Sequence, residues 1–301
     1  MREITVISGK GGAGKTTITG ALTSLLNKPV ITDCDVDAAD LYLLLQPEVQ
    51  ETHTFPGGAN AIINQQLCVN CRKCINHCRF DALNYNEDGV LTVNGYKCEG
   101  CGLCKNICPA NAIEMVQEFS NRWYISTTRY GSMIHAHMKP GEENSGKLVT
   151  KLRDAARKKA EENQASFIIN DGPPGIGCAA IASVTGTDMV VMVIEASKSG
   201  FHDFQRAQKL VDSFKTPIVA VINKHDINKT LTAEIEKYLS ELNIPLLAKI
   251  PFDKKLVDAT TQALTYPEYQ TDDAITESLR DIVTYLQKPD NYEKKQAQSA
   301  S

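Results

Sequence analysis

Eight of the ten cysteines in this sequence fall into two runs of identical spacing, Cys-x-x-Cys-x-x-Cys-x-x-x-Cys. The first run contains Cys68, Cys71, Cys74 and Cys78, and the second contains Cys98, Cys101, Cys104 and Cys108. Thiolates at this density indicate metal binding, because disulfides are rare inside cells. Two zinc sites built from paired Cys-x-x-Cys elements are one alternative. The third cysteine of each run, and the Pro109 that follows Cys108, favour iron–sulfur clusters instead.

The repeated spacing resembles that of bacterial two-cluster ferredoxins, in which the fourth cysteine of each run binds the other run's 4Fe–4S cluster. The resemblance implies one cluster on Cys68, Cys71, Cys74 and Cys108, and a second on Cys98, Cys101, Cys104 and Cys78. Arg79 departs from the pattern, because a proline often stands there, but no ligand is lost. We expect a hairpin over residues 82–93 and a closing strand over 112–116.

A second chemical site lies near the N-terminus, where residues 8–17 read Ser-Gly-Lys-Gly-Gly-Ala-Gly-Lys-Thr-Thr between a strand-like run and a helix-like run. A strand, a glycine-rich turn and a helix in this order form a phosphate-binding loop, in which backbone N–H groups and the helix N-terminus face the phosphates. We expect Lys15 to reach the β- and γ-phosphates and the Thr16 hydroxyl to bind Mg²⁺. The predicted nucleotide-binding residues of the loop are Gly9, Lys10, Gly11, Gly12, Ala13, Gly14, Lys15, Thr16 and Thr17.

The order Lys-Gly-Gly-x-Gly-Lys-Thr in this loop resembles the deviant Walker A loop of the MinD, Mrp and nitrogenase-iron-protein ATPases. In that family two subunits face each other across their nucleotides, and the early lysine reaches the phosphate of the partner subunit. The resemblance implies that Lys10 stabilises charge in trans, that Lys10 and Lys15 are both catalytic, and that the active form is a homodimer.

Acidic residues follow two apolar strands, a position where Mg²⁺ or the attacking water is held beside a phosphate-binding loop. They are Asp33, Asp35 and Asp37 after the first strand, and Asp171 after the second. By resemblance to switch I of the MinD-like ATPases, Asp35 orients or activates water, and Asp33 or Asp37 contributes to the Mg²⁺ shell. A helix-capping turn is the alternative for Asp35. Asp171, in Asp-Gly-Pro-Pro-Gly, resembles the Walker B aspartate and switch II of the Mrp-type ATPases.

The identity of the nucleotide base is open between two interpretations. A strand over 218–222 ends in Asn223-Lys224-His225-Asp226, and Asn-Lys-x-Asp after a strand is the guanine-reading signature of GTPases. The MinD-like ATPases read adenine with an asparagine at this point, and the type of phosphate-binding loop favours ATP. Asn223 is the expected base contact in both cases. The segment 251–253 could edge the base pocket, or Asp253 could cap the next helix.

Other side chains carry two possible roles each. Cys178 falls near a bridging-cluster ligand of the nitrogenase iron protein, and Cys34 is the remaining spare cysteine, but a small buried residue is the simpler interpretation of Cys178. His135 and His137 could bind a metal or carry protons, although a structural or surface role is favoured. Lys147 stands at the start of a helix expected over 148–162, where it could help to bind an anion or could be an ordinary helix start.

Composition excludes several classes of function. The chain has 301 residues, of which 42% are apolar, which suits one large α/β domain and a small module. A net charge of −4 and a pI of about 5.9 argue against a general nucleic-acid or anionic-membrane surface. We find no apolar run of membrane-spanning length, and the phosphate-binding loop begins too early to leave room for a signal peptide. We therefore expect a cytoplasmic protein without stable membrane insertion.

The pattern of apolar runs predicts a doubly wound, mostly parallel α/β sheet with helices on both faces and an inserted ferredoxin-like α+β module. We expect a discontinuous P-loop domain over 1–56 and 120–288, an inserted two-cluster domain over 57–119, and a disordered polar tail over 289–301.

The two resemblances together describe a MinD-superfamily ATPase with an inserted ferredoxin domain, which implies ATP, Mg²⁺ and two 4Fe–4S clusters as cofactors. The leading hypothesis is an ATPase that couples hydrolysis to electron transfer to an unidentified redox partner protein. One alternative is an Mrp-type carrier or scaffold for iron–sulfur clusters or metal. Another is a regulatory or positioning ATPase whose clusters are structural or sense redox state.

Overall fold

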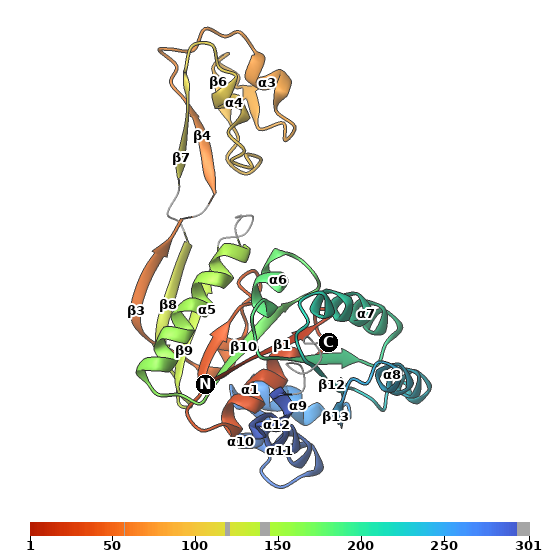
Figure 1. The fold of residues 1–301 in the computed structure, drawn as a ribbon. Helices are drawn as coiled ribbons and strands as arrows, with labels where there is room; N and C mark the ends of the chain where they lie inside the picture. Colours follow the sequence, from red (N-terminus) through yellow and green to blue (C-terminus); the bar gives the residue numbers. More distant parts are fainter. Residues whose placement is uncertain (57, 118–120, 139–144, 294–301) are drawn as a thin grey trace. The chain divides into compact units, whose positions relative to one another are not determined.

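The computed structural model describes residues 1–56, 58–117, 121–138 and 145–293, and it divides into two compact units (Figure 1). The first unit comprises Met1–His53, Trp123–His137 and Ser145–Ser301, and the second comprises Thr54–Arg122 with Met138–Asn144. Among the described residues, we find no helix with both the length and the apolar composition needed to cross a bilayer.

The first unit is built on a nine-stranded sheet in the order β13-β12-β11-β1-β10-β2-β9-β8-β3. The strands are β1 Arg2–Ser8, β2 Val30–Asp33, β3 Glu48–Phe55, β8 Asn121–Thr127, β9 Ser132–His137, β10 Phe167–Pro174, β11 Met189–Glu195, β12 Ile218–Asn223 and β13 Leu246–Ile250. The seven strands from β13 to β9 pair in parallel. This arrangement confirms the predicted mostly parallel α/β fold.

Helices cover both faces of this sheet because its central strands are apolar on both sides (Figure 1). In β1, Ile4 packs with Leu22 of α1 on one face, and Ile7 packs with Phe204 of α7 on the other. The helices on the first face include α1 Lys15–Leu25, α2 Leu41–Leu45, α9 Lys254–Thr261, α10 Tyr266–Tyr269 and α11 Ala274–Gln287. Those on the second face include α5 Ser145–Glu162, α6 Cys178–Val184, α7 Lys198–Ser213 and α8 Lys229–Glu241.

The second unit is smaller and antiparallel. It contains β4 Ala59–Ile63 paired with β7 Ile113–Gln117, the hairpin of β5 Leu83–Tyr85 and β6 Leu91–Val93, and the short helices α3 Lys73–His77 and α4 Leu103–Asn106. The hairpin turns as predicted, with the Gly89 N–H donating to the Asn86 carbonyl. A compact core forms around Leu83, Leu91 and Ile113, and several of the cysteines pack against it.

Several elements were not predicted from the sequence. They include β3, β4, β9, the short helices of the second unit, α6 and the short helix α12 Asp290–Glu293. The disordered tail predicted over 289–301 is therefore wrong for residues 290–293, which form α12. The Tyr292 hydroxyl donates to the Leu286 carbonyl, and the Arg2 guanidinium lies 4.5 Å from the Tyr292 ring centroid. The polar composition of this segment gave no indication that the Tyr292 ring would anchor it. Residues 294–301 lie outside the described part of the chain.

Candidate functional site

The phosphate-binding loop connects β1 to α1 and depends on glycine at particular positions. Gly12 and Gly14 have φ values of 78° and 89°, a region that side chains with a Cβ rarely adopt. A Cβ on Gly14 would also lie 2.2 Å from Nδ2 of Asn223, and one on Gly9 would lie 2.3 Å from the backbone of Asp203. The loop can therefore close against β12 and α7 because these residues lack side chains.

Lys15 lies inside this loop among carboxylates from two other strands. Its Nζ is 3.1 Å from Oδ1 of Asp171 and 3.5 Å from Oδ2 of Asp35, and its side chain is only 7% exposed. Burial lowers the pKa of Lys15, but the negative charges of Asp171, Asp35 and Asp33 outweigh burial and raise the pKa overall. Lys15 is therefore a buried ammonium whose charge is already compensated by the predicted switch residues.

The hydroxyls of α1 complete a polar cluster around Asp171. Thr16 Oγ1 donates to Oδ2 of Asp171 at 2.8 Å, and Thr19 Oγ1 donates to Oδ1 at 2.7 Å. Thr19 was not predicted as a site residue, although its place one helical turn after Lys15 is a signal that could have found it.

Asp33 carries the clearest sign that this cluster is built for a further ligand. It is 1% exposed, and its Oδ2 has no hydrogen-bond partner among the described residues. Burial, with the nearby Asp171 carboxylate, raises the pKa of Asp33 well above its ordinary value. Hydroxyl and carboxylate oxygens are the donors that Mg²⁺ prefers, so the residues present fit a hydrated Mg²⁺ ion. Asp37 is exposed and does not join the buried carboxylates.

Lys10, at the start of the loop, is held by its own chain. Its Nζ donates to Ser199 Oγ at 3.1 Å and lies 3.7 Å from Oε1 of Glu195. Glu195 also pairs with Lys224, whose Nζ is 3.0 Å from Oε2 and donates to the Gly12 carbonyl at 3.1 Å. Glu195 was not predicted as a site residue, because no sequence motif connects a carboxylate at the end of β11 with the loop.

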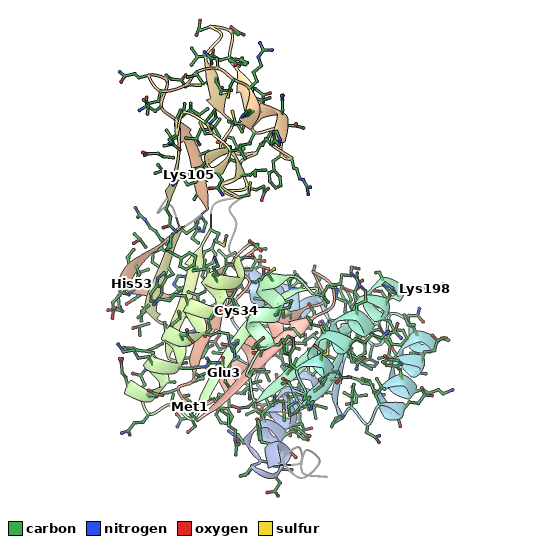
Figure 2. The ribbon with its side chains drawn as sticks, turned by 45° about the horizontal axis from the view of Figure 1, so that its top comes forward. Met1, Glu3, Cys34, His53, Lys105 and Lys198 are labelled. Atoms are coloured by element: carbon green, nitrogen blue, oxygen red, sulfur yellow. The ribbon has the colours of Figure 1, made fainter. Side chains whose placement is uncertain are left out.

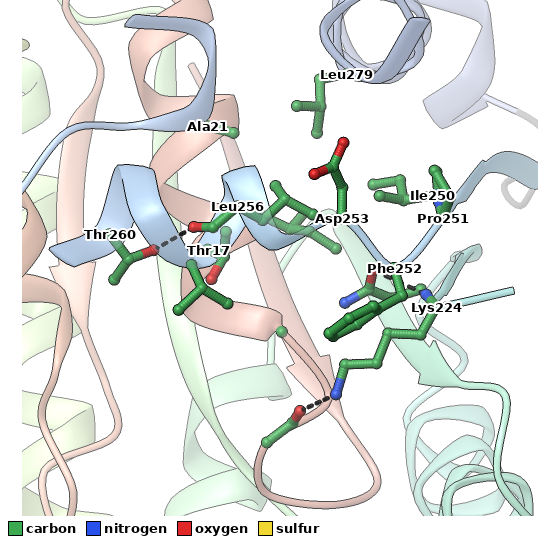
Figure 3. A pocket seen from close by; sticks show the side chains of 15 residues that line it. Thr17, Ala21, Lys224, Ile250, Pro251, Phe252, Asp253, Leu256, Thr260 and Leu279 are labelled. Carbon is green, nitrogen blue, oxygen red and sulfur yellow. Dashed lines mark hydrogen bonds between the residues drawn. The ribbon is translucent and has the colours of Figure 1, made fainter. Parts of the chain in front are cut away.

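A cavity of about 310 Å³ adjoins the loop and is lined mainly by apolar side chains of α1, α9 and the segment after β13 (Figure 3). Asn223 and Lys224 enter it from the end of β12. The Asn223 amide donates to the Ala13 carbonyl at 2.8 Å, and its oxygen accepts the Lys224 N–H at 3.0 Å. A base contact by Asn223 would therefore use the remaining N–H or lone pair of an amide that also braces the loop.

Asp253 and Asp226, the two acidic residues predicted to lie near the base, differ in their position relative to the cavity. Asp253 lines the cavity and also caps α9, because its Oδ1 accepts the Lys255 N–H at 2.8 Å. Asp226 is not among the described residues that line the cavity. Its carboxylate instead accepts the Phe252 N–H at 2.7 Å, a bond that lowers the pKa of Asp226. The residue in the guanine-reading position thus holds the wall of the cavity rather than facing into it.

The eight cysteines of the repeat line two cavities in the second unit. Cys68, Cys71, Cys74 and Cys108 line one of about 20 Å³, and Cys78, Cys98, Cys101 and Cys104 line another of about 300 Å³. Each set combines three cysteines of one run with the fourth of the other. The Ala112 N–H donates to Cys108 Sγ at 3.3 Å, as expected for a thiolate ligand.

The cysteine sets surround space rather than converge on a point. Among the described residues, no three His, Cys, Asp or Glu side chains come close enough to share one metal ion. We call each set of four cysteines a cage. Its four soft sulfur donors match the ligand chemistry of a 4Fe–4S cluster, whose iron atoms each take one thiolate.

The remaining candidates, Cys34, Cys178, His135 and His137, are not among the described residues that line these cavities. Cys34 is fully buried in the interior of the first unit (Figure 2), whereas Cys178 is exposed at the start of α6. Burial therefore removes Cys34 from any surface cluster that Cys178 could share. His135 is buried, with Nε2 2.8 Å from Ser126 Oγ, and burial lowers its pKa to about 4. This environment indicates a neutral, structural histidine, and His137 is exposed.

Comparisons with known proteins agree with this geometry. The family model described as the CobQ/CobB/MinD/ParA nucleotide binding domain matches residues 4–266. An uncharacterised protein of Methanocaldococcus jannaschii is 29% identical over 258 residues, covering 84% of this chain and 85% of that protein. The pyruvate synthase subunit PorD of the same organism is 37% identical over 57 residues, which are 19% of this chain and 66% of the subunit.

Among solved structures, the septum site-determining protein MinD of Pyrococcus horikoshii, complexed with Mg-ADP, has a similar fold. Its TM-score is 0.60 at 16% sequence identity, and the match covers 97% of this chain and 99% of that one. At this level of identity the similarity concerns the fold alone.

Proposed function

Because the chain belongs to the CobQ/CobB/MinD/ParA nucleotide-binding family, we propose that it is an ATPase that couples hydrolysis to electron transfer through two 4Fe–4S clusters to a partner protein. One observation carries this proposal: the buried cluster around Lys15 and the two four-cysteine cages occur in the same chain. An ATPase of this family would have no need of two complete cages for nucleotide chemistry alone.

In the nucleotide site, Lys15 and the loop N–H groups would bind the β- and γ-phosphates. Thr16 and Asp171 would position Mg²⁺, with Asp33 acting through water, and the ion when bound neutralises charge on the phosphates. Asp35 would orient the attacking water. Lys15 is already compensated by Asp35 and Asp171, so arriving phosphates would compete for it and leave the two carboxylates free to reorganise. This competition would make switch I and switch II sensitive to the bound nucleotide.

ATP is favoured over GTP by the cavity that adjoins the loop. Guanine recognition through Asn-Lys-x-Asp requires the aspartate to face the base, and Asp226 instead accepts the Phe252 N–H outside the lining. The mainly apolar cavity suits a stacked adenine, with Asn223 as the contact from β12.

The chain connects switch I to the cysteine-bearing unit through neighbouring strands. Asp33 ends β2, and β9 pairs directly with β2. Next to β9 lies β8, and next to β8 lies β3. The chain enters the inserted segment from β3 and returns from it into β8. A displacement of β2 on nucleotide binding could therefore reach both connections without crossing the whole sheet. We propose this route as the coupling between hydrolysis and the clusters.

The predicted homodimer can be tested by mixing two inactive variants. If Lys10 acts on the partner's nucleotide, Lys10→Ala and Lys15→Ala proteins should each be inactive alone. A mixed dimer would contain one intact site, with its own Lys15 and the partner's Lys10. An equal mixture that assorts at random should therefore restore up to about a quarter of the wild-type turnover, because half of the dimers are mixed. No recovery in a mixture shown to form mixed dimers would mean that Lys10 acts only within its own chain.

The coupling itself is tested by titrating the reduction potentials of the anaerobically prepared protein, with and without Mg²⁺ and a non-hydrolysable ATP analogue. We expect a shift of about tenfold in the reduction equilibrium, which is about 59 mV for a one-electron couple. Unchanged potentials, together with transfer of clusters to an apo-protein, would replace the proposal with a carrier function. Unchanged potentials with stable clusters would favour a structural role.

A further inference from the structure

We propose that the two clusters differ in reduction potential, and that the cluster held by Cys68, Cys71, Cys74 and Cys108 is reduced first. This inference rests on the proposed function, because it assumes that both cages are loaded. An electron that enters the module would then settle on this first cluster. The cluster held by Cys98, Cys101, Cys104 and Cys78 would be the stronger reductant.

Aligning the two cysteine runs shows where their charges differ. Between the second and third cysteines, the first run has Arg72-Lys73 and the second run has Gly102-Leu103. Between the first and second cysteines, the second run carries Glu99 where the first has a valine. The intervals between the first three cysteines thus hold two positive charges in one run and one negative charge in the other.

The structure places these charges at the cages. Arg72 and Lys73 both line the cavity of Cys68, Cys71, Cys74 and Cys108, and none of the described residues that line it is acidic. The other cavity is lined by Arg79 and Glu99, whose formal charges cancel. Lys97 and Lys105 adjoin cysteines of the second run in sequence, but neither is among the described residues lining that cavity. Adding an electron makes a cluster more negative, so the cage with uncompensated cations favours the reduced state.

The backbone at Arg72 supplies a second, independent reason to assign it a role. Arg72 has a φ of 60°, and Gly102, its counterpart in the other run, has a φ of 72°. Both stand immediately before a short helix, α3 and α4 respectively. Glycine adopts this conformation without strain, whereas a residue with a Cβ is strained in it. An arginine at this strained position therefore points to a function of its side chain. The Arg72 guanidinium also lies 5.5 Å from the Tyr85 ring centroid, a cation–π distance.

The repeat also provides the matched substitutions for a test. Arg72→Gly introduces the residue that already occupies the equivalent turn, so the backbone conformation is retained and the charge is lost. Gly102→Arg is the reciprocal change, and Arg72→Lys keeps the charge. The experiment is an EPR-monitored potentiometric titration of the full-length holoprotein at pH 8, where imidazoles are generally neutral, with iron content measured for each variant.

We expect two resolved couples in the wild type. Arg72→Gly should lower only the higher couple, by about threefold in its reduction equilibrium or about 30 mV, because the charge is exposed to solvent. Gly102→Arg should raise only the lower couple by a similar amount, and Arg72→Lys should leave both unchanged. Raising the salt concentration should reduce these shifts.

Three results would overturn the inference: coincident couples in the wild type, an Arg72→Gly effect on the lower couple, or no effect of either reciprocal variant at low salt. These outcomes are separate from failure of the proposed function. Two distinct couples that ignore the ATP analogue would keep this inference and reject nucleotide coupling. Coincident couples that shift with the analogue would do the opposite, and iron for fewer than two clusters would reject both.

Discussion

The two units of this protein build their sites in opposite ways. In the first unit, the acids around Lys15 come from β2, from the segment after it and from β10, and the candidate nucleotide site is closed by contacts among its own side chains above an apolar core. In the second unit, the described core has five buried residues, one of which is Cys74, and five other cysteines pack against it. The first unit therefore has a complete core beneath its site, whereas in the second unit the proposed ligands are also much of the core.

This difference predicts where stability comes from. A unit of this size buries too little apolar surface to be robust without metal or cross-links. When a metal site forms only in the folded state, its binding free energy becomes folding free energy. We therefore expect the clusters to hold the second unit together, and the first unit to fold whether or not nucleotide is present.

The largest effect should come from breaking a cage. Cys74→Ser removes a buried ligand, so we expect loss of iron and loss of hydrogen-exchange protection in β4 and β7, while β10 stays protected. The matched control is Cys178→Ser, which changes an exposed cysteine outside both cages and should leave iron and protection intact. If protection in β10 fell together with that in β4, the two units would not be independent in stability.

The reciprocal experiment changes the nucleotide site. Lys15→Gln removes the ammonium from among three carboxylates, and we expect ATP turnover to fall by at least about 100-fold. Asp35→Asn should act in the same direction. Iron content should be unchanged, because these residues belong to the other unit. Lys237→Gln, at a highly exposed lysine of α8, is the control and should alter neither property. Loss of iron in the Lys15 variant would contradict the separation of roles.

Acid sensitivity offers a smaller test within the first unit. Because burial lowers the pKa of His135 to about 4, the unfolded chain takes up a proton as the pH falls below about 6.5 while the folded chain does not. His135 thus contributes stability that is complete above pH 6.5 and is lost as the pH falls towards 4, by at most about 3 kcal/mol.

Denaturant unfolding of the first unit at several pH values would measure this loss. His135→Gln keeps a neutral partner for Ser126 and should flatten the pH dependence, whereas His137→Gln at the exposed neighbour should not. An equal pH dependence in wild type and His135→Gln would mean that other groups set the acid limit.

The smallest effect is expected at Glu195, which contacts both Lys10 and Lys224. Glu195→Gln should weaken the hold on Lys10 without removing its bond to Ser199. A partly exposed ion pair contributes at most about 1 kcal/mol, so we expect ATP turnover to change by less than about fivefold. A loss as large as that of Lys15→Gln would show that Glu195 belongs to the catalytic group rather than to its support.

Local spacing determined much of what could be inferred from the sequence. The cysteine runs and the phosphate-binding loop are short patterns whose residues lie close together in any folded chain, so their composition indicates their chemistry directly. The alternation of apolar strands with helices likewise sufficed to predict a mostly parallel sheet, which the structure confirms. Each of the two cavities in the second unit is lined by three cysteines of one run and the fourth of the other, and the binding of a cluster by each set stays a prediction.

Tertiary structure decided whatever depended on burial and on contacts between distant segments. Asp33 and Asp37 look equivalent in sequence, yet of the two only Asp33 is enclosed, and its Oδ2 has no hydrogen-bond partner in the described part of the chain. Asp226 has the sequence spacing of a base-reading residue, but its carboxylate accepts a hydrogen bond from the Phe252 N–H and so supports the wall of the cavity. Glu195 reaches Lys10 across 185 positions of sequence. Such relations follow from the packing of whole strands and helices, because long-range contacts set the burial and partners of each charge.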